Sequence, residues 1–171
     1  MLKPLKVEQV TQLISSWQPN IDSSASHVLT HLAEGCPGKA LNLMENNGSA
    51  LYEDLITVLN ALPECDVISQ HKLADRICRR GNEADFITFI SLLGWWVTRM
   101  VRFVAVGKPP IEVVQGEVEI ASRLFLSHNL EHWIEVWENI SFLATKANSI
   151  HLDRKQVLLN VFSLLQNAAR A

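Results

Sequence analysis

Apolar residues recur at intervals of three and four along the chain, which is the spacing of one face of an α-helix. In the N-terminal quarter this pattern predicts three short helices. The first ends before Pro19, the second is capped by Asp22 or Ser23, and the third runs from Pro37 to about Glu45. The sequence ENNG at residues 45–48 then interrupts the pattern and predicts a boundary between two units.

From Ser49 onward the same spacing predicts about six longer helices with short connections. Two of them are predicted to begin after Asp66 and Asp153, because these carboxylates can accept hydrogen bonds from the free amides of a first turn. Residues 111–126 are predicted to form another helix, and strand-like alternation is almost absent. The sequence therefore predicts an all-α fold, with a small three-helix unit followed by a larger helical bundle.

The longest apolar run, residues 86–106, is the candidate for a membrane-spanning helix. It is long enough to span a bilayer. However, Arg99 and Arg102 lie inside it, and each would cost about 2.5–3.5 kcal/mol near the bilayer centre on insertion scales. The centre of a helical bundle equally requires a helix that is apolar nearly all round. We therefore expect a core helix with a capping box from Asn82 to Asp85. Its predicted buried residues are Leu93, Trp96 and Met100.

Composition and charge narrow the function classes. The chain has 171 residues, 48% hydrophobic and 19% charged, which suffices for one sizeable core or two small ones. Its formal net charge is −3, so no overall basic field favours nucleic acid. The first ten residues lack the apolar stretch of a secretory signal. A cytoplasmic protein with reduced thiols is therefore expected, rather than one with disulfides or a zinc site; its cysteines are Cys36, Cys65 and Cys78.

Few side chains suggest chemistry of their own. His27 with His31, and His128 with His132, have a four-residue spacing that can hold zinc, but neither pair forms a His-Glu-x-x-His motif. A metal hydrolase built on these pairs is the weakest of the function classes considered. No phosphate loop and no nucleophilic Ser or Cys motif is present. We therefore expect no catalytic residue, metal or cofactor. The tryptophans on apolar stripes favour core packing over base stacking: Trp95, Trp96, Trp133 and Trp137.

The most distinctive local signal is the stretch GCPGK at residues 35–39. Gly35 suits the end of one helix, and Pro37 suits the first turn of the next. Lys39 then lies in that first turn, where the helix dipole disfavours a cation unless an anion binds there. Lys39 is therefore either a solvent-exposed side chain after a tight turn or a contact for a phosphate.

Four segments, in order along the chain, resemble one protein family. Residues 32–43 (LAEGCPGKALNL) resemble the lid of AAA+ clamp-loader subunits, in which a Gly-x-x-Gly-Arg/Lys turn opens the sensor 2 helix. Residues 2–10 (LKPLKVEQV) are similar to the connection into that lid. Residues 130–140 and 148–165 resemble the last two collar helices of the delta-prime subunits of bacterial DNA polymerase III. The resemblance covers nearly the whole chain.

The resemblance implies a lid at residues 1–47, a collar at residues 48–171 and an ATPase core N-terminal to this segment. It implies a non-catalytic part of the polymerase holoenzyme, which acts in DNA replication by joining subunits of the loader. Its partners would be other clamp-loader subunits, and it would reach the sliding clamp and primed DNA only through the assembled complex, with no membrane. In this family the residue at the position of Lys39 can face nucleotide, so Lys39 is the candidate nucleotide contact.

The resemblance is densest in the last two helices, so an interface is expected within residues 130–169. Leu158 and Phe162, one turn apart, are predicted to be either core or interface. Charged side chains are expected on the rim, where they set register more than affinity: Glu131, Glu135, Arg154 and Lys155. The alternative function is a stand-alone helical adaptor that binds another protein or its own copy.

Overall fold

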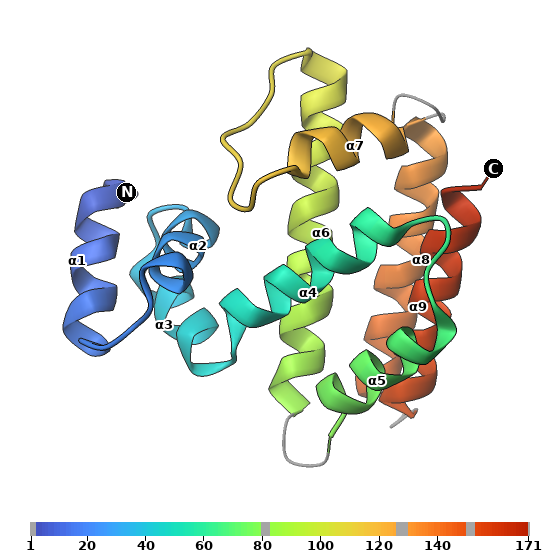
Figure 1. Cartoon of the computed structure of the whole chain (residues 1–171), viewed down its shortest axis with the longest axis horizontal. Helices are drawn as coiled ribbons and strands as arrows, with labels where there is room; N and C mark the ends of the chain where they lie inside the picture. The colour runs from blue at the N-terminus through green and yellow to red at the C-terminus, as the bar shows by residue number, and fades with distance from the viewer. Residues whose placement is uncertain (1–2, 80–82, 126–129, 150–152, 171) are drawn as a thin grey trace.

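The structure, a computed structural model, describes residues 3–79, 83–125, 130–149 and 153–170. These residues form nine α-helices and no strand, which confirms the all-α prediction (Figure 1). The helices are α1 (Val7–Trp17), α2 (Ser23–Ala33), α3 (Pro37–Glu45), α4 (Gly48–Ala61), α5 (Val67–Ile77), α6 (Glu83–Val106), α7 (Glu117–Phe125), α8 (Leu130–Ser149) and α9 (Arg154–Ala168).

The predicted helix starts are set by carboxylate caps. The side chain of Asp22 accepts hydrogen bonds from the backbone amides of Ser24 and Ala25 at the start of α2. Asp66 and Asp153 do the same for the first turns of α5 and α9. Because these amides have no partner within the helix, each cap stabilises its helix by about 1 kcal/mol. The predicted capping box at Asn82 and His128 of the second histidine pair lie outside the described residues.

The N-terminal helices α1, α2 and α3 pack on one another, and α4 connects them to the rest of the chain (Figure 1). The turn before α4 places Asn47 in the left-handed region, at the predicted unit boundary. However, α4 packs against α2 and α3 as well as against α6 and α7. One continuous hydrophobic core therefore extends through both units, from Val10 in α1 to Ala169 after α9.

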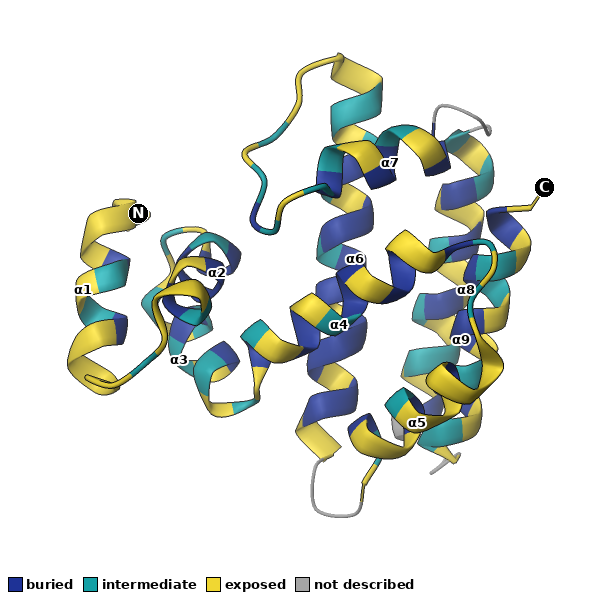
Figure 2. Cartoon of the chain, in the orientation of Figure 1, coloured by how far each residue is buried: buried dark blue, intermediate teal, exposed yellow. Residues whose placement is uncertain are grey.

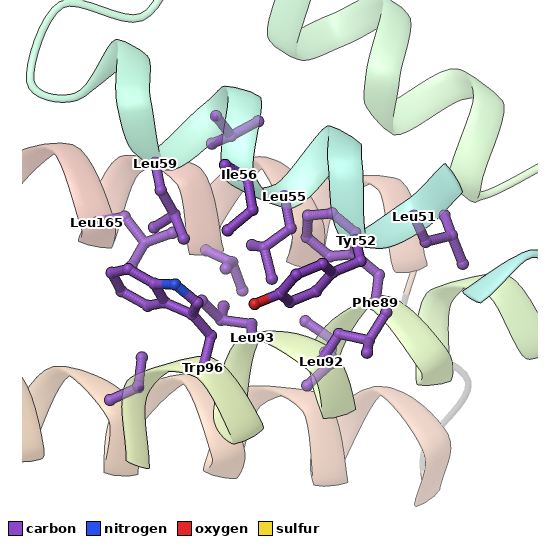
Figure 3. Close-up of a cluster of buried hydrophobic side chains, with 14 of the residues drawn as sticks. Leu51, Tyr52, Leu55, Ile56, Leu59, Phe89, Leu92, Leu93, Trp96 and Leu165 are labelled. Carbon is purple, nitrogen blue, oxygen red and sulfur yellow. The ribbon is translucent and has the colours of Figure 1, made fainter. Parts of the chain in front are cut away.

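Helix α6 is the centre of the larger bundle, where it packs against α4, α5, α7 and α8. The predicted core residues Leu93, Trp96 and Met100 are all 0% exposed. Figure 2 shows buried positions along much of α6, and Figure 3 shows Trp96 among leucines of α4 and α9. By length and composition α6 is the one helix among the described residues that could cross a membrane. Its packing on four helices instead supports the expected core position.

The contact between α6 and α8 depends on Gly94. The ring of Trp137, on α8, lies so close to Gly94 that a Cβ atom there would clash with it. Trp137 itself is half-buried against the core. A glycine within a helix normally lowers its stability. Here the absence of a side chain at Gly94 lets α8 pack closely against α6. Trp133, also on α8, is 1% exposed. Both tryptophans of α8 therefore pack against the core, as predicted.

The prediction of a helix from residue 111 to residue 126 is wrong in its first part. Residues 107–116 form a loop, and α7 begins only at Glu117. The carboxylate of Glu112 accepts hydrogen bonds from the amides of Gly116 and Val118, and Glu117 binds two further amides of this segment. Gly116 has a φ of 95°, which ends any helical path there. These side-chain contacts replace the helical hydrogen bonds that the apolar spacing suggested.

Replacing Trp96 by Ala should lower the free energy of unfolding by about 3–5 kcal/mol, because a fully buried aromatic side chain leaves a cavity. Urea denaturation followed by far-UV circular dichroism measures this change. Ser91→Ala, at an exposed position of the same helix, is the matched control and should stay within about 0.5 kcal/mol of the wild type. Equal effects of the two substitutions would contradict the central position of α6.

Candidate functional site

Lys39 lies at the junction of the two helical units, where side chains from several helices meet. Its Nζ atom is 3.1 Å from Oε2 of Glu34, the residue that ends α2. It also lies 5.7 Å from the ring centroid of Trp95 on α6. The guanidinium of Arg99, one turn further along α6, lies 4.8 Å from the same ring. Two cations thus share one indole, whose π-face attracts positive charge.

The junction is anchored by Glu117, a carboxylate with no exposed surface. It accepts hydrogen bonds from the Tyr52 hydroxyl at 2.5 Å, the Arg99 guanidinium at 2.7 Å, and the amides of Val113 and Val114 at 3.2 and 3.1 Å. Burial of a carboxylate is tolerated only when its charge and lone pairs are satisfied in this way. Glu117 therefore ties together α4, α6, α7 and the loop before α7.

The neighbouring groups titrate in the directions that this packing dictates. Burial raises the pKa of Tyr52, and the adjacent Glu117 raises it further, so the hydroxyl remains a donor at neutral pH. Burial, His27 and Arg99 lower the pKa of His31, which is therefore neutral at pH 7. Burial opposes ionisation of Glu34, but Trp95 and Lys39 outweigh it and lower the pKa of that carboxyl. The stabilisation from Glu34 is thus present at neutral pH and is lost as the pH falls through that lowered value.

The junction is electrically balanced, because each of its cations already has a carboxylate. Arg99 is held by the buried Glu117, whereas Lys39 is held by Glu34, with 37% and 59% of their side chains exposed. A phosphate could reach Lys39 only by competing with Glu34. The ion pair between Lys39 and Glu34 is exposed to solvent and is therefore weak. Chemically the junction can exchange one anion for another at Lys39 while Glu117 keeps Arg99 in place.

The expected interface residues lie on α9, but in the core. Leu158 and Phe162 are both 0% exposed, so they cannot contact another chain while α9 keeps its position. Of the two predicted positions, core or interface, the structure shows the core for both residues. Their assignment to an interface is therefore wrong. Arg154 and Lys155 form ion pairs within the chain, with Glu83 on α6 at 3.5 Å and Asp75 on α5 at 2.6 Å. Glu131 and Glu135 are exposed on α8.

The histidine and cysteine candidates do not come together into a site in the described part of the chain. The rings of His27 and His31 lie 4.4 Å apart, but no group of three metal-ligating side chains occurs in the described part of the chain. The three cysteines are separate free thiols. Sequence reasoning missed Tyr52 and Glu117 altogether and used Arg99 only as evidence against a membrane. The signal in the sequence that could have revealed this site was Arg99 itself. A charge inside an apolar helix needs a buried partner.

No family model, curated protein or solved structure matches this chain. The resemblance to clamp-loader subunits therefore rests on the four sequence segments that carry it.

Replacing Glu117 by Gln should lower the free energy of unfolding by about 3–5 kcal/mol, as expected when one partner of a buried ion pair is removed. The amide would leave Arg99 without a counter-charge and would turn an NH2 group toward hydrogen-bond donors. Glu119→Gln, at an exposed position of the same helix, is the matched control and should change stability by less than about 0.5 kcal/mol. A loss below about 1 kcal/mol for Glu117→Gln in urea denaturation would argue against an anchoring role for the carboxylate.

The thiols should react with Ellman's reagent in an order set by their exposure and their pKa. Cys36 is exposed and should react first at pH 8, whereas burial raises the pKa of Cys78 to about 11, so it should react last. All three should react in denaturant without reductant. Fewer than three reactive thiols, restored by reductant or by a chelator, would reveal a disulfide or a bound metal and contradict the expectation of reduced, unligated cysteines.

Proposed function

We propose that this chain is a non-catalytic subunit segment of the bacterial DNA polymerase III clamp loader, acting in DNA replication in the cytoplasm. Helices α1–α3 would form its lid and α4–α9 its collar. The observation that carries the proposal is the ordered set of four family-like segments. The arrangement of three short helices before a larger bundle supports it. The chain would join loader subunits and would meet the sliding clamp and primed DNA only within that assembly.

Lys39 would be the nucleotide contact of the lid, as the resemblance implies. Its position supports a coupling role, because Lys39 and Arg99 lie against the same indole at the lid–collar junction. A phosphate that displaced Glu34 from Lys39 would change a contact between α2 and α3 without disturbing Glu117. Binding of a nucleotide phosphate at Lys39 would thereby change the contacts at this junction.

The subunit interface would lie on the exposed side of α8, within the C-terminal hairpin that carries the resemblance. Ile134 and Phe142 expose 44% and 57% of their surface there. Exposed apolar side chains on a helix are suited to burial against a partner. These two replace Leu158 and Phe162 as the proposed apolar contacts. The same exposed residues also favour the second candidate function, a stand-alone helical adaptor.

Co-expression with the affinity-tagged clamp-loader subunits of the same organism tests the proposal. The chain should elute with them in gel filtration. Phe142→Asp should weaken the complex at least about tenfold, as for a contact near the centre of an interface. Val67→Asp, at an exposed apolar position on α5, is the matched control and should leave the complex intact.

The possible results separate the two functions. Elution of the wild-type chain apart from every loader subunit would contradict the clamp-loader proposal and favour the adaptor. A complex that survives Phe142→Asp but is lost with Val67→Asp would place the interface on α5 and contradict the assignment to α8. Circular dichroism of both variants excludes loss of folding as the cause of either result.

A further inference from the structure

The C-terminal end of α6 and the loop that follows it form a pocket of about 470 Å³. Its walls come from one short stretch of the chain, residues 99–111. Apolar side chains line it, among them Phe103, Val106 and Ile111, and so do the cations Arg102 and Lys108. In Figure 1 this end of α6 and the loop project beyond α7, away from the centre of the bundle.

The apolar walls of this pocket are unusually exposed. Ile111 and Val106 have 75% and 69% of their surface exposed, more than any other large apolar side chain in the described part of the chain. A single exposed apolar residue needs no explanation, but several around one cavity indicate a binding surface. The cavity volume lies in the range of ordinary ligand and side-chain pockets.

The charges around the pocket have one sign. Its ionisable side chains are Arg99, Arg102 and Lys108, and no carboxylate lines it. Arg99 is neutralised by Glu117. Arg102 and Lys108 are exposed, and neither forms an ion pair with a described residue. The pocket therefore combines exposed apolar walls with two available cations.

The loop that carries half of the pocket is restrained at both of its ends. The amide of Gly107 donates to the carbonyl of Phe103 at 2.8 Å and closes the end of α6. Pro109 and Pro110 have fixed φ angles and need no amide partner. At the other end of the loop, the carboxylates of Glu112 and Glu117 accept hydrogen bonds from the amides of Val113, Val114 and Gly116. Because the loop is restrained at both ends, a partner would have less of it to order on binding.

We propose that this pocket binds an acidic, apolar peptide segment of a partner protein. A large apolar side chain of the peptide would pack against Phe103, Val106 and Ile111, and carboxylates beside it would pair with Arg102 and Lys108. Nucleic acid fits less well, because two available cations neutralise only two phosphates and the most exposed walls, Val106 and Ile111, are aliphatic and offer no surface for base stacking. The proposal goes beyond the clamp-loader assignment and does not depend on it.

Selection of phage-displayed random dodecapeptides on the full chain tests this proposal. Binders should be enriched in Asp or Glu next to Leu, Phe or Trp. Selected peptides, made synthetically with a fluorescein label, should bind at least about tenfold more weakly to Arg102→Glu and to Ile111→Ser in fluorescence anisotropy. Arg79→Glu and Ile68→Ser are the matched controls, at exposed positions away from the pocket, and should bind like the wild type.

Three results would overturn the proposal. The first is a selection that yields no peptide sensitive to Arg102→Glu and Ile111→Ser. The second is tight, Arg102-dependent binding of a fluorescein-labelled oligothymidylate, which would make the pocket a nucleic-acid contact. The third is concentration-dependent dimerisation in analytical ultracentrifugation that Ile111→Ser abolishes, which would make a second copy of the chain the occupant. Circular dichroism of every variant excludes loss of folding.

Discussion

The carboxylate of Glu117 imposes the constraint on which the arrangement of the larger bundle depends. A charge with no exposed surface must be balanced and hydrogen bonded, or the chain would not fold around it. Its partners come from α4, α6 and the loop before α7, since they are Tyr52, Arg99 and two backbone amides. Segments separated by as many as 65 positions in the sequence are thereby fixed at one point. Apolar burial is non-directional, whereas hydrogen bonds to the two oxygens of one carboxylate require a defined placement of α7 and its loop.

Arg99 carries the effect of that constraint to two surfaces. Its guanidinium binds Glu117 and also lies 4.8 Å from the ring centroid of Trp95, the ring that Lys39 approaches as well. The same side chain borders the pocket at the end of α6. The junction around Lys39 and the pocket therefore share one fixed residue, Arg99. A substitution of Glu117 should therefore alter both the junction and the pocket, although Glu117 itself has no exposed surface.

The sequence predicted best those features that depend on neighbouring residues. The caps Asp22, Asp66 and Asp153 act within one turn, and the core position of α6 follows from an apolar pattern with few exceptions. The loop at residues 111–116 was mistaken for helix because the carboxylate that binds it, Glu117, also needs Tyr52, a residue 65 positions away. The sequence left Leu158 open, since an apolar residue at helical spacing fits a core and an interface equally.

Charge balance distinguishes the two candidate surfaces in a way that sequence cannot. At the junction each cation has a carboxylate from this chain, so an anion would have to displace Glu34 before it reached Lys39. In the pocket, Arg102 and Lys108 have no such competitor, and the apolar walls beside them are the most exposed in the described part of the chain. Binding there exchanges only water and counter-ions for partner groups, whereas binding at Lys39 also breaks an ion pair. The junction is therefore suited to transmit a change between the two units, and the pocket is suited to hold a partner.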